Sequence, residues 1–194
     1  MVRKKRKANL DGVNLKIEET LCMLRDLTME VSMMTAKRTQ GKLTPEEFRK
    51  ASQQGLQLLY DWWNNLDPAI MQEYDNMTLP ANVPLEDVCP FRPARLYKGT
   101  RWPVNFMICD YYGLIIMLKH QIALTNGSGV DSSLHDYAIK ICGILAAIEA
   151  FPEAPAGSLL ASQAPIGLAA LWVPDLPGYR RWMQKQLAKA EQMG

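Results

Sequence analysis

The sequence predicts an all-α fold, an irregular domain of about six to seven helices packed in antiparallel and orthogonal arrangements. Apolar residues recur at spacings of three, four and seven along most of the chain, which is the period of a helix with one buried face. No segment shows the sustained apolar–polar alternation, flanked by turn dipeptides, that is typical of a strand. A long proline-rich crossover divides the predicted helices into two groups.

Length and charge favour a single helical domain, residues 13–194, behind a basic disordered tail, residues 1–12. Of the 194 residues, 48% are hydrophobic and 22% charged, a balance with which a chain of this size buries a core without disulfides or metal. The five consecutive basic residues of the tail leave 17 basic against 20 acidic residues, a net charge of −3. Specific nucleic-acid binding by the folded part is therefore not expected.

Residues 13–66 are predicted to form a helical hairpin. The first amphipathic helix starts near Asn14, and Gly41 ends it. The succession Thr44-Pro45-Glu46-Glu47 then has the pattern of a capping box with proline at the first helical position. The predicted buried faces comprise Ile17, Leu21, Leu24, Val31 and Met34 in the first helix, and Phe48, Ala51, Leu56, Leu59, Trp62 and Trp63 in the second.

The next segment, residues 67–102, is predicted to be an ordered but irregular crossover with at most one helical turn. Between Asp67 and Pro103 the chain holds six of its twelve prolines, and proline lacks the N–H that helices and sheets use. The segment also carries too many large apolar residues for a solvated linker. An irregular passage over the helices satisfies both observations.

Residues 103–194 are predicted to be the helical core. A helix from Pro103 to Leu124 is apolar almost all round and is therefore expected to be the most buried element. The next helix is capped by Asp131-Ser132-Ser133. A helix over 157–172 should be kinked or split at Pro165, and a last helix should start at Asp175 or Pro177.

Two carboxylates stand in these apolar helices. Asp110 precedes Tyr111 and Tyr112 midway along one helix, and Glu149 lies near the end of the next. A buried acid beside tyrosines suits acid–base catalysis or ligand binding, which makes Asp110, Tyr112 and Glu149 the candidate catalytic residues. The alternative is structural, with Asp110 capping a backbone or pairing with Arg95, Arg101 or Lys119. No catalytic motif is present, and the existence of an activity stays open.

Aromatic and sulfur-containing residues suggest binding surfaces, each with a competing explanation. Trp62, Tyr111 and Trp172 are candidates to line a ligand pocket, although aromatic residues at helical spacing also suit a core. The stripe of Met29, Met33 and Met34 suits either a partner groove or packing against the second helix. No metal site is expected, because the two histidines and four cysteines lack the close pairs of zinc ligands. No cofactor motif is present.

The basic run is a candidate nuclear localisation signal, formed by Arg3, Lys4, Lys5, Arg6 and Lys7. A solvated terminus or a nonspecific tether to polyanions is the alternative. The stretch from Val104 to Leu118 is too short for the roughly 20 residues that cross a bilayer. The sequence thus predicts a nuclear or cytoplasmic protein, in a reducing compartment, that binds a protein partner or a small apolar effector. Homodimer formation stays open.

The last third of the chain contains Gly157, then Pro165-Ile166, Ala169 and the succession Tyr179-Arg180-Arg181-Trp182. In this order the chain, from about Trp62 to its end, resembles the C-terminal part of the helical regulatory region of fungal binuclear zinc-cluster transcription factors. Ile166 stands where that family usually has Leu. The Cys-x2-Cys-x6-Cys cluster with which such factors ligate zinc and read DNA is missing, since the four cysteines stand far apart.

The resemblance implies a transcription-factor-like regulatory domain that binds a protein or an effector and lacks its own DNA-binding module. An alternative is a small stand-alone enzyme of fungal secondary metabolism, of cyclase or isomerase type, on the same helical scaffold. An apolar cavity whose wall includes Asp110 would favour the enzyme.

Overall fold

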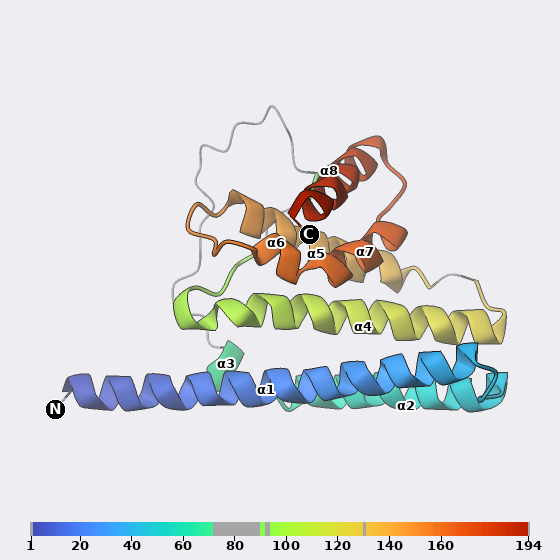
Figure 1. Cartoon of the computed structure of the whole chain (residues 1–194), viewed down its shortest axis with the longest axis horizontal. Coiled ribbons are helices and arrows are strands. Elements are labelled where there is room, and N and C mark those ends of the chain that lie inside the picture. The colour runs from blue at the N-terminus through green and yellow to red at the C-terminus, as the bar shows by residue number, and fades with distance from the viewer. Residues whose placement is uncertain (1, 72–89, 92–93, 130, 194) are drawn as a thin grey trace.

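The computed structural model describes residues 2–71, 90–91, 94–129 and 131–193, and these ranges contain helices and turns but no strand. The predicted all-α fold is confirmed. The helices are stacked in layers (Figure 1): the hairpin of α1 (Val2–Thr39) and α2 (Pro45–Asn64) lies under α4 (Trp102–Asn126). Above α4 lie α5 (Ser133–Ala150), α6 (Ser158–Ala161) and α7 (Gln163–Trp172), and α8 (Pro177–Met193) covers them.

Helix α1 is longer than the sequence predicts. Its backbone is helical from Val2, so the basic run occupies the first turns of a helix and not an irregular tail. The run has no proline and no glycine before Gly12, and lysine and arginine are good helix formers, which explains why the helix continues through it. The predicted apolar face is confirmed further along, where Ile17, Leu24 and Val31 are buried.

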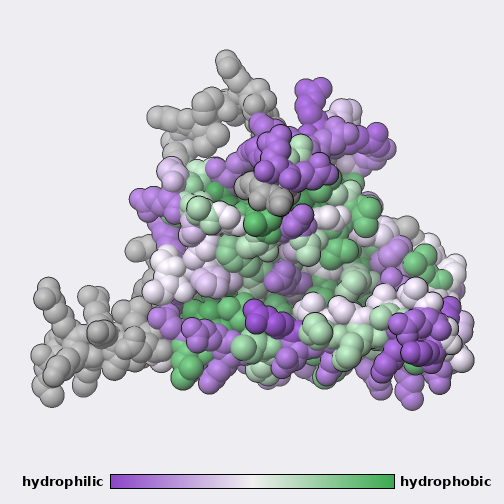
Figure 2. Space-filling view, in the orientation of Figure 1, coloured by the Kyte–Doolittle hydropathy of each residue, from purple (hydrophilic) through white to green (hydrophobic). Residues whose placement is uncertain are grey.

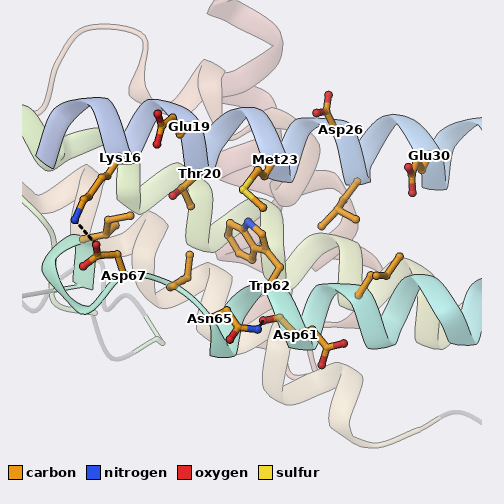
Figure 3. Close-up of a pocket in the computed structure, with 14 residues that line it drawn as sticks. Lys16, Glu19, Thr20, Met23, Asp26, Glu30, Asp61, Trp62, Asn65 and Asp67 are labelled. Atoms are coloured by element: carbon orange, nitrogen blue, oxygen red, sulfur yellow. Dashed lines mark hydrogen bonds and ion pairs between the residues drawn. The ribbon is translucent and has the colours of Figure 1, made fainter. Parts of the chain in front are cut away.

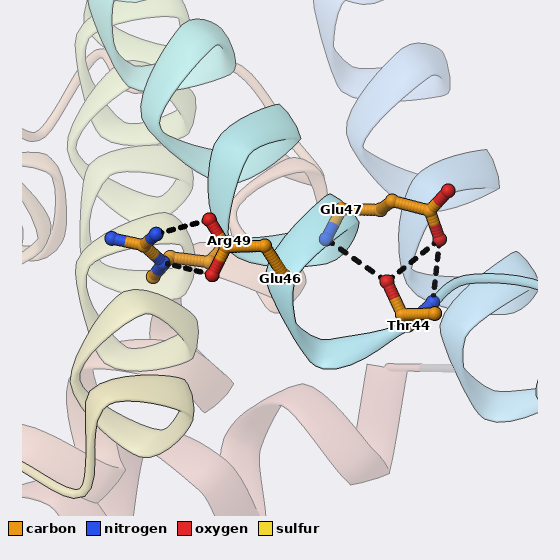
Figure 4. Close-up of polar contacts among 4 residues, drawn as sticks. All are labelled: Thr44, Glu46, Glu47 and Arg49. Carbon is orange, nitrogen blue, oxygen red and sulfur yellow. Dashed lines mark hydrogen bonds and ion pairs between the residues drawn. The ribbon is translucent and has the colours of Figure 1, made fainter.

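The capping box at the start of α2 is present as predicted (Figure 4). The backbone N–H of Thr44 donates to Glu47 Oε2 at 2.8 Å, and the backbone N–H of Glu47 donates to Thr44 Oγ1 at 3.2 Å. These reciprocal bonds satisfy two N–H groups that a helix start otherwise leaves free. They lower the pKa of the Glu47 carboxyl, first through the backbone bond and then through the Thr44 hydroxyl. The cap fixes where the chain turns back along α1.

The crossover is anchored at both ends. Directly after α2 the single helical turn α3 (Pro68–Met71) buries Ile70, while residues 72–89 and 92–93 of the predicted crossover lie outside the described residues. At the far end, the 3-10 turn η2 (Gly99–Arg101) leads into α4. The buried side chain of Asn105 accepts from the Tyr97 N–H and donates to the Tyr97 carbonyl, both at 2.9 Å, which holds the incoming chain against α4.

Helix α4 is the central element, but α5 is the more completely buried one. Eleven of the 25 residues of α4 are buried, against ten of the 18 residues of α5. The prediction that α4 would be the most buried element was therefore wrong. The reason is length: the last turn of α4 extends past α5 and α7, and Leu124 is exposed there. The shorter α5 lies between α4 and α7 over most of its turns.

The break between α6 and α7 falls at Ser162 and not at Pro165. Pro165 lies in the first turn of α7, where a missing N–H costs no hydrogen bond. The N–H of Ser162 bonds back to Leu159, which closes α6 after one turn. Of the two predicted alternatives, a kink or a split, the split is present, and it lies three residues before Pro165.

Two apolar clusters form the interior. One unites α1, α2 and α4, and the other unites α4, α5, α7 and α8. Ile108, Tyr112 and Tyr137 pack against both clusters, so α4 and α5 join them. On the surface, hydrophilic residues dominate over α8 and over the turn between α1 and α2, with hydrophobic patches between the layers (Figure 2).

Candidate binding groove between α1 and α2

A groove of about 670 Å³ runs between α1 and α2 and is closed at one end by α3 (Figure 3). Its floor is apolar and comprises Met23, Leu27, Leu58, Trp62, Leu66 and Ile70. The α1 residues that line it follow one stripe, at Lys16, Glu19, Thr20, Met23, Asp26, Leu27 and Glu30, which has the three- and four-residue spacing of one helix face. This stripe lies beside the buried stripe of α1, so the hairpin packs along one face and leaves the neighbouring face open.

The rim of the groove is acidic. Glu19, Asp26 and Glu30 lie on the α1 side and Asp61 on the α2 side. The one cation among the lining residues, Lys16, donates to Asp67 Oδ2 at 2.5 Å. That bond, followed by the Ala69 N–H, lowers the pKa of the Asp67 carboxyl. With Lys16 and Asp67 paired, four carboxylates of the rim remain to set the charge of the groove.

Trp62 forms the centre of the floor, and its indole N–H has no acceptor in the part of the chain that the structure describes. The side chain rises from α2 toward α1, and its nitrogen points toward Met23 (Figure 3). The residue is 7% exposed, and no acceptor among the described residues lies within hydrogen-bond reach of Nε1. A buried donor without a partner is costly. An acceptor supplied by a bound molecule in the groove would remove that cost.

Behind the groove lies a cluster of aromatic rings that supports Trp62. Tyr111 lies 5.8 Å from Trp62, and it stacks on Trp63 at 4.3 Å with 15° between the ring planes. Burial, with Tyr137 as the second cause, raises the pKa of Tyr60 to about 12. Burial likewise raises the pKa of Tyr111. These phenols therefore stay protonated at neutral pH and act as packing groups.

The third predicted pocket residue, Trp172, lies elsewhere. It packs against the cluster of α5, α7 and α8. Its ring lies 4.9 Å from that of His120, and its carbonyl lies 2.5 Å from His135 Nδ1. The structure thus brings Trp62 and Tyr111 together and places Trp172 away from them, at the end of α7.

Asp110 is half-buried, and no described residue forms a hydrogen bond or ion pair with its carboxylate. Burial alone raises its pKa to about 6. Lys119, one of the alternative partners suggested for Asp110, donates instead to Asp131 at 3.0 Å and to Ser133 at 2.7 Å. Asp110 does not line the groove between α1 and α2. Tyr112, two residues on, lies 5.7 Å from Tyr137 with Lys140 over its ring.

Glu149 does not occupy the apolar site that the sequence suggests. Its side chain is partly exposed and is held by α8, where Gln186 donates to Oε2 at 2.7 Å and Lys189 pairs with Oε1. The polar face of α8 reaches the end of α5 at this point. Glu149 is therefore a structural link between two helices, and it does not join Asp110 or Tyr112 in one site.

The buried periodicity of the sequence does not indicate the groove, because the residues that line it on α1 form a second stripe of that helix. Met29 and Met33 are exposed but do not line the groove, and Met34 packs on Ser52. The methionine that does line it is Met23. Acidic residues at positions 19, 26 and 30 around an apolar position 23 were the available signal.

Four further findings concern the basic run, metal binding, membrane spans and known proteins. The side chains of the basic run lie outside the described residues. Among the residues that are described, no cluster of three potential ligands could hold a metal ion, and no helix combines the length and apolar content needed to cross a membrane. Comparisons of the chain with protein-family models, curated proteins and solved structures found no match.

Proposed function

We propose that this chain is a regulatory, protein-interaction or effector-binding domain of transcription-factor type, without a DNA-binding module of its own. The observation that carries the proposal is the groove between α1 and α2. Its volume of about 670 Å³ lies within the range of about 300–1,000 Å³ that is typical of ligand sites. Its floor is apolar and its rim is charged, as in surfaces that bind a partner or an effector.

The composition of the groove supports binding over catalysis. Its lining contains carboxylates, one amide, one hydroxyl, one ammonium group and apolar groups but no histidine or cysteine. The carboxylate side chains on the α1 side of the rim are solvent-exposed and attract cations.

The residues that carry the family resemblance support a shared scaffold. Gly157 adopts a left-handed conformation with φ of +80° before α6, which side chains other than glycine rarely adopt. Pro165, Ile166 and Ala169 are buried in α7, and Trp182 is buried in α8. Residues of this kind position helices. They bear on the fold, and the function rests on the groove.

The enzyme alternative rests on Asp110. A carboxyl with a pKa of about 6 suits an acid–base catalyst at neutral pH. In an enzyme of cyclase or isomerase type, Asp110 would protonate or deprotonate the substrate, and Asp110→Asn would abolish turnover without loss of folding. In the binding domain, the same substitution would leave groove binding unchanged.

The binding proposal is tested with Nile red, an uncharged dye whose emission rises in apolar sites. The wild-type chain should bind the dye saturably. The double variant Met23→Gln/Leu58→Gln makes the floor polar without a change in charge, and it should weaken binding at least tenfold. The matched control, Met29→Gln/Met33→Gln, changes two exposed methionines outside the groove and should bind like wild type. No saturable binding, or equal loss in both variants, would contradict the proposal.

A further inference from the structure

We infer that the occupant of the groove is a basic amphipathic α-helix of a partner protein. This inference rests on the proposed function and specifies its partner. Four properties of the groove carry it: its length, the exposed apolar side chains of its floor, the arrangement of its charges and the indole N–H of Trp62, which lacks an acceptor among the described residues.

The length of the groove matches a helix of about four turns. On α1 the lining runs from Lys16 to Glu30, and at 1.5 Å per residue those positions span about 21 Å. A compact effector would fill only part of such a channel. An extended helix laid along it would place apolar residues at i, i+3, i+4 and i+7 on the floor, as in other helix-in-groove complexes.

The floor offers anchoring positions for those residues. Met23 is 58% exposed and Leu58 is 48% exposed on opposite sides of the channel. Methionine is flexible and polarisable, so Met23 adapts to different apolar side chains. Trp62 between them is held by its contacts with Trp63 and Tyr111 and supplies a rigid aromatic surface at the centre, where binding energy tends to concentrate.

The negative charges of the rim favour a positively charged partner. Carboxylates flank the floor on both sides, with Glu19, Asp26 and Glu30 on α1 and Asp61 on α2. A helix with lysine or arginine beside its apolar stripe would face them on both edges. Such exposed pairs chiefly raise the association rate and the specificity. A nucleic acid or an acidic helix would be repelled by the same carboxylates.

The indole of Trp62 adds a hydrogen-bond requirement. Its Nε1–H is buried, points across the channel toward α1 and lacks an acceptor among the described residues. The backbone carbonyls of a bound helix are already paired inside the helix. The acceptor would therefore be a side-chain oxygen on the apolar stripe of the partner, from glutamine, asparagine, serine or threonine.

The test uses a synthetic 14-residue peptide with leucines at helical spacing, one central glutamine and lysines elsewhere, labelled with fluorescein. Fluorescence anisotropy with the full chain should show saturable binding at least tenfold tighter than that of a scrambled peptide of the same composition. The same peptide with glutamate for lysine should not bind. The double variant Met23→Gln/Leu58→Gln should lose at least tenfold in affinity, and Met29→Gln/Met33→Gln should lose none.

Two triple variants, one in the rim and one outside the groove, test the charge requirement. Glu19→Gln/Asp26→Asn/Glu30→Gln removes three rim charges and should weaken the lysine peptide at least tenfold at low salt while Nile red binding persists. Glu18→Gln/Asp136→Asn/Glu153→Gln removes the same charge at exposed positions outside the groove and should have much less effect. Equal losses in the two triple variants would overturn the inference, because they would show attraction to net charge alone.

Two other outcomes separate this inference from the proposed function. Nile red bound in the groove, with the helical and scrambled peptides equal, would overturn the inference and leave an apolar effector as the ligand. Failure of both probes would overturn the proposed function as well. Self-association in sedimentation equilibrium that Met23→Gln/Leu58→Gln abolishes, without specific peptide binding, would overturn the inference by identifying a second copy of the chain as the occupant.

Discussion

At the scale of single residues, Asp110 is a carboxyl group whose partly buried position disfavours its charged form. Burial raises its pKa to about 6, whereas an aspartate in an unfolded chain titrates near 3.9. Between about pH 4 and 6 the folded state therefore binds more protons than the unfolded state. Stability from this group is fully present below about pH 4 and is lost as the pH rises through 6. At neutral pH the ionised carboxylate destabilises the fold.

Asp110→Asn should accordingly stabilise the protein at pH 7. The amide is neutral at every pH and removes a cost on the order of 1–2 kcal/mol, once solvent screening of this half-buried group is included. For a chain of this size that corresponds to a rise in melting temperature of roughly 2–8 °C. At pH 4 the difference between variant and wild type should vanish. Thermal melts at the two pH values measure both effects.

The exposed Asp26 provides a control for Asp110, because Asp26→Asn makes the same change in the middle of a helix. It should shift the melting temperature little at either pH. A loss of stability in Asp110→Asn at pH 7 would contradict the account, since it would mean that the carboxylate accepts a stabilising hydrogen bond in the folded protein.

The two candidate acids show what sequence reasoning could and could not predict about single residues. Asp110 stands among apolar residues of its own helix, and the burial expected from that pattern is present. Glu149 has an equally apolar local setting, yet Gln186 and Lys189 reach it from 37 and 40 residues away. The periodicity of one helix predicts only which of its own residues face the core. It does not predict a polar side chain that another helix supplies.

At the scale of elements, local chemistry predicted the helix starts better than the breaks. The capping box at Thr44 and the start of α5 after Asp131 are both present, because each depends on hydrogen bonds between residues two or three apart. The break at Ser162 was displaced toward Pro165 in the prediction. Proline indicates that a preceding helix cannot continue through its position, because it lacks the N–H for the next hydrogen bond. It does not indicate how many residues before the proline that helix ends.

The crossing of α4 and α7 depends on a glycine whose role only the packing reveals. A Cβ on Gly113 would lie 3.3 Å from Leu168 Cδ1 and 3.9 Å from the Pro165 Cα. Gly113→Val would add further atoms toward that backbone, and we expect a loss of about 1–3 kcal/mol in the free energy of unfolding. Chemical denaturation of the variant and the wild type measures this loss.

Gly167, in α7, is the matched control for Gly113. It also lies inside a helix, but a Cβ there would meet nothing within 4 Å. Gly167→Val should change the free energy of unfolding by less than about 0.5 kcal/mol, because glycine and β-branched residues are both poor helix formers and the added Cβ meets no neighbouring atom. Similar losses in the two variants would indicate that helix propensity, and not the close approach of α4 to α7, controls the effect.

At the scale of the whole molecule, the layered stack explains why the groove escaped prediction. The all-α class follows from periodicity, and the buried stripes of α1 and α2 are recognisable from their apolar spacing. The groove requires in addition that α1 and α2 diverge enough for Trp62 to line the space between them and that α3 folds back with Ile70 to close the end. Both are tertiary features that depend on how the hairpin packs on α4. No pattern within one segment of the sequence determines that packing.

Charge is also segregated across the whole molecule, and this yields the last prediction. The five basic residues from Arg3 to Lys7 stand in a chain whose remaining residues carry a net charge of −3. The chain should therefore bind duplex DNA only weakly and without sequence preference. With at most five phosphates neutralised, affinity should fall by about 10²- to 10³-fold between 50 and 200 mM salt. Fluorescence anisotropy with two duplexes of unrelated sequence should give equal affinities.

Replacement of all five basic residues by glutamine keeps good helix formers in α1 and should abolish that binding, while Nile red still binds the groove. If the run is a nuclear signal, a fluorescent fusion of the wild-type chain should concentrate in the nucleus and the glutamine variant should spread to the cytoplasm. The exposed Lys42 and Lys50 are a control outside the run, and their replacement by glutamine should leave the fusion nuclear. Sequence-dependent DNA binding that resists salt would show instead that the folded helices carry a DNA-reading surface, against the charge of the groove and of the body as a whole.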